Sequence, residues 1–238
     1  MSSPREFLET SRSEESKRRV KRWIGVSAGA LILLIAGVLL WLFFLSTTFS
    51  AKEVVVQGVK LLDVQAVRQS ASVRSDVPLA RLDTNAIRER VEKLPEVRKA
   101  EVSVDYPSTV RIQVTERVAL YQLAKQNAFS WVDAEGVEFR TGQGRSKTLP
   151  EAKLRRDDER IRRDVATVAT HVPQAAKGKV TQISARSVDR IELSLADKRT
   201  IIWGSADESE LKSEVLQTLL SVDAKVYDVS APQHPTTK

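Results

Sequence analysis

The side chains that most often perform chemistry in proteins are scarce in this chain. It has no cysteine, and its two histidines are His171 and His234. The lack of cysteine excludes a disulfide scaffold, a thiolate metal site and a cysteine nucleophile. Two histidines cannot supply three imidazole ligands to a metal ion, and a serine–histidine–aspartate site could use only one of them.

The remaining candidates have simpler interpretations. His171 follows the apolar stripe of a predicted helix and is expected to be a partly buried residue at a helix end, whereas His234 lies in a tail rich in proline and threonine. Asp157 and Asp158 are adjacent, so on a helix they diverge by about 100° and cannot act on one bond. Residues 142–144 lack the rest of a phosphate-binding fingerprint. The sequence therefore predicts no catalytic residue, no metal site and no cofactor.

Residues 24–45 form an uncharged and strongly apolar run. As a helix rising about 1.5 Å per residue, this run covers about 33 Å, enough for the hydrocarbon core of a bilayer. A cluster of lysine and arginine directly precedes it at residues 17–22, and positive charge stays on the cytoplasmic side. We therefore expect a single-pass membrane helix with a cytoplasmic N-terminus. A cleaved signal peptide is the alternative, although its apolar region is normally shorter.

The positive charge does not indicate a nucleic-acid-binding surface. The net charge is +7, and residues 1–23 contribute seven basic and four acidic groups to it. This basic cluster is explained by membrane topology and by anionic lipid head groups, and the rest of the excess is spread thinly. Residues 1–23 are also poor in apolar side chains and are predicted to be a disordered cytoplasmic tail.

Residues 52–115 carry alternating strand and helix patterns. A strand over 54–56 ends at Gly58, and apolar residues within 64–71 and 87–94 share helical faces. Residues 100–114 then alternate apolar and polar side chains on both sides of a Pro107-Ser108 turn, as in a hairpin with one buried face. The order strand, helix, helix, strand, strand predicts two helices on one face of a three-stranded sheet.

Four stretches of this region resemble one known domain. They are a strand followed by Gly58, Leu79-x-x-Leu82-Asp83, Leu94-Pro95-Glu96-Val97-x-x-Ala100-x-Val102, and Tyr106-Pro107-Ser108-Thr109-Val110-x-Ile112-x-Val114-x-Glu116-Arg117. Together they closely resemble a POTRA domain and, more narrowly, that of the FtsQ/DivIB family of bacterial cell-division proteins. The short basic tail and single anchor also match that family. We expect a POTRA domain over 46–123, a β-rich domain over 124–231 and a disordered tail over 232–238.

The second half is predicted to be another α+β domain with a mostly antiparallel sheet. Two short strands flank a Glu135-Gly136 turn, and Val132-Asp133-x-x-Gly136 resembles the start of the family's second domain. The mixed charges of residues 153–164 indicate the solvated face of a helix, with a charged binding patch as the alternative. The remaining patterns predict strands over 180–184, 190–195 and 200–203, a helix from about residue 207, and a last strand over 225–230.

The last strand carries the expected partner-binding site. Because the sequence ends soon after it, this strand is expected at a sheet edge, where a partner strand can add by main-chain pairing. The resemblance implies that this region receives the division proteins FtsB and FtsL. Tyr227 is the expected anchor, because aromatic side chains dominate interface energetics; alternation explains equally well a Tyr227 and Val229 packed on the domain's own core. Carried over, the partner-binding residues are Val226, Tyr227, Asp228, Val229 and Ser230.

These features predict a non-enzymatic scaffold of the division machinery, the divisome, anchored in the plasma membrane at the septum. It would link early and late division proteins. The expected partners are FtsB- and FtsL-like bitopic proteins and the lipid bilayer, without nucleic acid or a small-molecule substrate. One alternative is a POTRA-type binding or chaperone module for another envelope assembly process, but such proteins usually carry strings of POTRA repeats without an anchor. A cell-wall enzyme would need a site that these side chains do not form.

Overall fold

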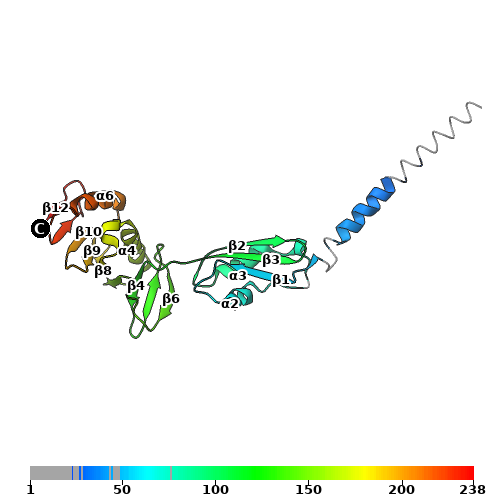
Figure 1. Ribbon diagram of the computed structural model, residues 1–238, viewed down its shortest axis with the longest axis horizontal. Helices are drawn as coiled ribbons and strands as arrows, with labels where there is room; N and C mark the ends of the chain where they lie inside the picture. The colour runs from blue at the N-terminus through cyan, green and yellow to red at the C-terminus, as the bar shows by residue number, and fades with distance from the viewer. Residues whose placement is uncertain (1–22, 24–26, 28, 43, 45–48, 76) are drawn as a thin grey trace, which may run out of the picture. The chain divides into compact units, whose positions relative to one another are not determined.

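A computed structural model describes residues 23, 27, 29–42, 44, 49–75 and 77–238 (Figure 1). Residues 29–42 are helical, and most of their large apolar side chains are exposed, that of Leu33 to 75%. Within the described part of the chain, no helix is both long and apolar enough to cross a membrane. Residues 1–22 of the predicted tail and several positions of the predicted span over 24–45 lie outside the described residues.

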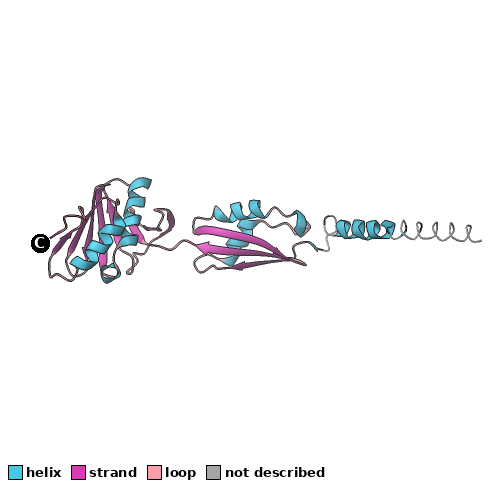
Figure 2. Ribbon diagram, turned by 90° about the horizontal axis from the view of Figure 1, so that it is seen from above, coloured by secondary structure: helices cyan, strands magenta, loops and turns pink. Residues whose placement is uncertain are grey.

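The first folded region has the predicted order of strand, two helices and two strands. In the sheet, β3 lies between β1 and β2, and β1 runs parallel to β3, with Val54 opposite Val110 and Val56 opposite Ile112. The helices cover one face of this sheet (Figure 2). The elements are β1 (Glu53–Gln57), α2 (Val64–Ala71), the 3-10 turn η2 (Leu79–Arg81), α3 (Thr84–Glu92), β2 (Val97–Asp105) and β3 (Thr109–Glu116).

Alternating side chains build this region as the pattern predicts. Val110, Ile112 and Val114 of β3 are buried, and the residues between them are not. Both helices bury an apolar stripe, which is the main source of stability for helices as short as these. The end of α2 is fastened by Arg90 of α3, whose Nη2 donates to the carbonyl oxygen of Ala71 at 2.7 Å. A cation at the last carbonyls of a helix also suits the helix dipole.

Residues 119–238 are all described, and they contain a nine-stranded sheet. Its spatial order is β12-β11-β10-β9-β8-β7-β4-β5-β6. Pairing is parallel only for β10 with β11, β4 with β7 and β7 with β8, so the sheet is mostly antiparallel. The strands are β4 (Tyr121–Ala124), β5 (Phe129–Val132), β6 (Glu138–Gly142), β7 (Glu151–Leu154), β8 (Val180–Ser187), β9 (Arg190–Leu195), β10 (Thr200–Gly204), β11 (Val226–Asp228) and β12 (Thr236–Thr237).

Three helices accompany this sheet, namely α4 (Glu159–His171), the short α5 (Gln174–Lys177) and α6 (Ser209–Leu219). Side chains of α4 and α6, such as Val165 and Leu216, join one core with Trp203 of β10 and Tyr227 of β11. The helix predicted from the charged run at 153–164 begins later than expected. Residues 151–154 are strand β7, and α4 starts after Asp158, whose carboxylate accepts the N–H of Ile161 as an N-cap.

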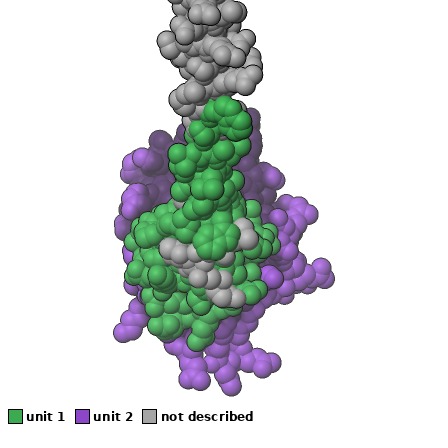
Figure 3. All heavy atoms as spheres, turned by 90° about the vertical axis from the view of Figure 1, so that its right-hand side faces the viewer, with its two compact units in different colours: residues 1–57, 65–90, 101–113 green, residues 58–64, 91–100, 114–238 purple. Residues whose placement is uncertain are grey.

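By packing, the chain divides into two compact units, drawn in two colours in Figure 3. Unit 1 comprises residues 1–57, 65–90 and 101–113, and unit 2 comprises residues 58–64, 91–100 and 114–238. Unit 2 thus contains the whole nine-stranded sheet. Because β4 belongs to that sheet, the domain boundary expected after residue 123 falls inside a strand.

Two of the motifs noted in the sequence have clear structural roles within unit 2. Asp133 is 3% exposed, and its Oδ1 accepts the N–H groups of Glu135 and Val137 at 2.9 Å each, while its other oxygen pairs with Arg117. Gly136 has φ +77°, and a Cβ there would lie 2.7 Å from the backbone nitrogen of Arg163 in α4. The Val132-Asp133-x-x-Gly136 motif therefore closes a turn against which α4 packs, and only glycine fits its last position.

Candidate partner-binding edge

The strand expected at the sheet edge is the second strand from that edge. Strand β11 lies between β10, to which it is parallel, and β12, to which it is antiparallel. The outermost strand is β12, in which Thr236 and Thr237 pair with Asp228 and Tyr227. The expectation that residues 226–230 form the free edge is therefore wrong, as is the expectation of a disordered tail for the residues of β12.

The backbone between β11 and β12 explains how such a short strand forms. The N–H of His234 donates to the carbonyl oxygen of Ala231 at 2.9 Å, and this turn brings the chain back along β11. Val226 and Lys238 then exchange two hydrogen bonds, each 2.9 Å long, and the N–H of Lys225 also donates to the carbonyl oxygen of Lys238 at 2.7 Å. Threonine, a β-branched residue, suits both positions of the strand.

Tyr227 belongs to the domain's own core. Its side chain is 0% exposed, and its hydroxyl donates to the carbonyl oxygen of Val222 at 2.7 Å. Nη1 of Arg199 donates to the same hydroxyl oxygen at 3.0 Å, and the guanidinium lies 5.6 Å from the ring centroid. Asp197 and the hydroxyl of Tyr227 raise the pKa of Arg199. The structure therefore supports the core alternative for this side chain, because its polar tip and its ring are both used internally.

The other residues of the predicted set also have internal roles. Val229 is 0% exposed, and its N–H donates to the carbonyl oxygen of Ile202 at 2.9 Å. Ser230 closes a turn, with its N–H and hydroxyl both donating to Oδ1 of Asp228 at 3.0 and 2.6 Å. Gly204 approaches Ser230 so closely that an added Cβ would lie 2.8 Å from the serine Cβ. The side chains of Tyr227 and Val229 thus face the domain core. Toward the edge of the sheet, on the side of β12, the strand presents mainly its main-chain groups.

The main-chain groups of β11 divide between its two neighbours. The carbonyl oxygen of Lys225 and the N–H of Val229 bond to β10, whereas both main-chain groups of Val226 bond to Lys238 beyond β12. Successive residues of a strand direct these groups to opposite sides, so Val226 and Asp228 face outward. Among the described residues, β12 and Lys238 alone cover them. The main-chain donors and acceptors of Val226 and Asp228, which we call the outward row, are thus the groups of β11 to which a partner strand could pair, whereas the side chain of Tyr227 is not.

The residues considered for chemistry are held in structural interactions. His171 ends α4, is partly buried, and its Nδ1 lies 2.8 Å from the carbonyl oxygen of Thr167, so the helix-end prediction is confirmed. Asp157 accepts hydrogen bonds from Lys125 and Arg162, each 2.6 Å long, and although burial opposes the change these bonds lower the pKa of its carboxyl. Across the described residues, no group of three or more histidine, aspartate or glutamate side chains is placed to hold a metal ion.

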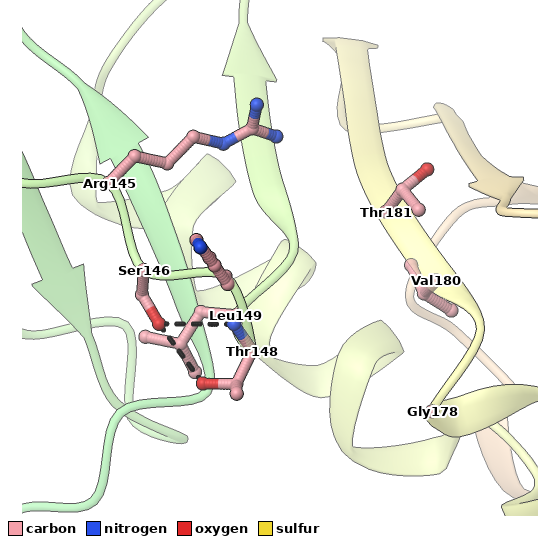
Figure 4. A pocket seen from close by; sticks show the side chains of 8 residues that line it. Arg145, Ser146, Thr148, Leu149, Gly178, Val180 and Thr181 are labelled. Atoms are coloured by element: carbon pink, nitrogen blue, oxygen red, sulfur yellow. Dashed lines mark hydrogen bonds between the residues drawn. The ribbon is translucent and has the colours of Figure 1, made fainter.

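Unit 2 also has a polar hollow of about 590 Å³, between the loop before β7 and the start of β8. Figure 4 shows Arg145 extended over this hollow from the loop, with Val180 and Thr181 on the opposite wall. The hydroxyl of Ser146 lies 3.0 Å from that of Thr148, which places both within the loop's own hydrogen bonding. The lining carries cations and hydroxyls but no carboxylate or imidazole, and nothing in the sequence had singled it out.

Comparison with known proteins gives the family. The model of the FtsQ-type POTRA domain matches residues 49–117, and that of the C-terminal region of cell division protein FtsQ/DivIB matches residues 119–232. The chain belongs to the FtsQ/DivIB family of cell division proteins.

Its relatives match over nearly the whole chain. Cell division protein FtsQ of Streptomyces bingchenggensis is 31% identical over 237 residues, covering 93% of this chain and 89% of the relative. That of Streptomyces coelicolor is 32% identical, covering 91% and 88%, and that of Mycobacterium tuberculosis is 31% identical, covering 97% and 74%. The solved extracytoplasmic domain of DivIB from Geobacillus stearothermophilus aligns with 50% of this chain and 98% of that chain, at 10% identity and a TM-score of 0.36.

Proposed function

We propose that this chain is a non-enzymatic, membrane-anchored scaffold of the divisome at the septum, and that it links early and late division proteins by extracytoplasmic contacts. Membership of the FtsQ/DivIB family supports a role in cell division. Anchoring would confine the folded regions to the membrane plane and raise their effective concentration toward other bitopic proteins. The partners in this proposal are FtsB- and FtsL-like proteins.

The anchor is the uncharged run at residues 24–45, within which residues 29–42 form a helix with exposed apolar side chains. The basic residues before it support a topology with the N-terminus in the cytoplasm and the folded regions outside. A phosphatase that folds only outside the cytoplasm, fused after Lys238, tests this topology. We expect an active fusion, and an inactive fusion with an active counterpart at the N-terminus would reverse the orientation.

The partner-binding segment in this proposal comprises Val226, Tyr227, Asp228, Val229 and Ser230, and the main-chain groups that it offers to the partner are those of Val226 and Asp228. A partner strand would take the place of β12 and pair with the outward row of Val226 and Asp228. The observation that carries the proposal is that, in the part of the chain that the structure describes, this row is covered only by the two residues of β12 and by Lys238. Strand addition at a sheet edge gains affinity from main-chain hydrogen bonds, so it needs no exposed side-chain anchor.

Replacement of Val226 by proline tests the proposal directly. Proline removes the outward N–H of Val226 but leaves the groups that bond to β10 in place. We expect Val226→Pro to lower co-purification of FtsB- and FtsL-like partners from membranes at least tenfold. The matched control is Val226→Ala, which keeps the N–H and should retain capture. Normal capture by the proline variant, at a normal melting temperature, would exclude pairing along β11.

A further inference from the structure

The polar hollow of about 590 Å³ continues into a second, apolar hollow of about 320 Å³. The two share Thr148, Gly178 and Val180 as lining residues. The apolar hollow is lined mainly by small and aliphatic side chains from the start of β4 to the start of β8. They are Ala119, Leu120, Pro150, Ala169, Val172 and Ile183. One continuous depression of unit 2 thus has a hydrophobic part beside a polar part.

The polar part is cationic. Arg145 and Lys147 line it, and Lys177 stands at the rim of the apolar part. Within the described residues, neither lysine takes part in a salt bridge, and Arg145 has one long contact of 3.3 Å to Glu151. Neither lining includes a carboxylate. The depression therefore carries two lysines without a salt bridge among the described residues, beside an arginine paired only with Glu151, and this excess of positive charge complements an anion.

The loop that carries these cations is held from beneath by a buried glutamine. Gln122 of β4 is 0% exposed, and its Nε2 donates to the carbonyl oxygens of Ser146 and Leu149 at 2.8 Å each. Its Oε1 accepts the N–H of Ser146 at 2.9 Å. Both N–H groups of the Gln122 amide and one of the two acceptor positions of its oxygen therefore bond to the same exposed loop. A loop fixed in this way presents its cations with little loss of entropy on binding.

From this geometry we infer that the depression is a second docking surface, for a short segment of a protein partner that carries an aliphatic side chain next to carboxylates. The aliphatic group would enter the hollow between Leu120 and Val180, and the carboxylates would meet Arg145 and Lys147. An inorganic anion would leave the apolar part empty, and a neutral apolar group would leave the cations unpaired. The inference rests on the proposed scaffold function only in taking a protein segment as the occupant.

Crosslinking with a defined peptide tests the inference. The probe is a synthetic octapeptide of glutamates around one photoactivatable leucine, added to the full chain in nanodiscs of neutral lipid. We expect crosslinks, mapped by mass spectrometry, at residues 119–120, 150, 172 and 180–183. The double variant Arg145→Glu with Lys147→Glu should reduce them at least fivefold. The charge-matched control, Lys52→Glu with Lys93→Glu, changes exposed lysines outside the depression and should leave them unchanged.

Three results would overturn the inference. They are crosslinks that map elsewhere, equal losses in both double variants at unchanged melting temperatures, and equal competition by a glutamate peptide without leucine or by inorganic phosphate. The first means that the depression is not the site, the second that only net charge matters, and the third that the apolar hollow contributes nothing. Since this measurement uses purified chain and a peptide, it is independent of the partner co-purification that tests the scaffold function.

Discussion

Removal of residues 236–238 should strengthen partner binding, because in the proposed mechanism these residues occupy the row that the partner strand needs. Three hydrogen bonds join residues 225 and 226 to Lys238, with lengths of 2.7 to 2.9 Å. At about 0.5–1.5 kcal/mol each, they contribute about 1.5–4.5 kcal/mol in total. Ordering three residues costs about 1–2 kcal/mol for each backbone, about 3–6 kcal/mol in total, which is as large as the gain from these three bonds. The pairing of Thr236 and Thr237 with Asp228 and Tyr227 adds to the gain, so the two sides nearly cancel, and we take a small net docking free energy of about 1–2 kcal/mol for β12.

This free energy sets the size of the expected effect. If β12 is docked by about 1–2 kcal/mol, the uncovered state makes up roughly 3–15% of the molecules, and the apparent Kd of a partner strand is raised by the inverse of that fraction. The deletion should then lower the Kd by about 7- to 30-fold. The assay is a titration of the full chain in nanodiscs with an FtsB-like partner, comparing the natural chain with the deletion variant.

Side-chain replacements provide the control for this prediction. Thr236→Ala with Thr237→Ala keeps every main-chain group of β12 and should change the Kd by less than twofold. An unchanged Kd after the deletion would mean that the partner does not compete with β12. A weaker affinity would mean that β12 itself is part of the surface the partner binds, and it would refute the replacement mechanism.

Three further predictions concern the fold that holds this edge. Gly136→Ala should lower the free energy of unfolding by about 2–4 kcal/mol, since the residue has φ +77° and a backbone neighbour at 2.7 Å, while Gly142→Ala, with open space around it, should change it by less than about 1 kcal/mol. Tyr227→Ala should lower the free energy of unfolding by about 3–5 kcal/mol, because it empties a fully buried position. Any loss of partner capture in that variant would then be due to unfolding and not to a lost contact with the partner. The third prediction concerns Glu116. Burial raises the pKa of its carboxyl, but the hydrogen bonds from the N–H groups of Leu62, Leu61 and Lys60 outweigh burial and lower this pKa below its ordinary 4.5. The stability it contributes is present above about pH 4.5 and is lost as the pH falls through the lower folded-state value, so chemical denaturation of Glu116→Gln should show a weaker acid dependence there than the natural chain.

Alternation predicted the elements that bury one face. The strands around Val110 and Leu193 lie where the sequence placed them. Alternation did not predict β4, because three successive residues of this four-residue strand are buried. Both faces of the strand are therefore covered, and apolar and polar positions do not alternate. Alternation failed also for β7, whose four residues lie next to a run of charges that favours a helix. Strands of four residues, such as these two, are too short for a two-residue alternation of apolar and polar side chains to be recognised in the sequence.

The identity of the edge strand could not be read from the sequence for a different reason. Whether β11 lies at the edge depends on whether the chain turns back after Ala231, and that turn is followed by only two strand residues, Thr236 and Thr237. Alternation at Tyr227 and Val229 is identical for a strand facing its own core and for one facing a partner. The hydrogen bonds of the tyrosine hydroxyl decide between these alternatives, and they involve Arg199 and Val222, which no local pattern connects to it.

Three residues of the motifs by which the family is recognised, Asp133, Gly136 and Glu116, have structural roles in the fold. Asp133 and Gly136 form a turn beneath α4, and Glu116 accepts the N–H groups that follow β1. The carboxylates of Asp133 and Glu116 thus bond within the fold. The proposed contact along β11 uses N–H and C=O groups, which every residue except proline supplies alike. Specificity must then come from what surrounds the row, namely the length of β12 and the surfaces beside it. A scaffold of this kind can keep its binding geometry while its edge sequence varies, provided that the strand stays between β10 and a weak cover.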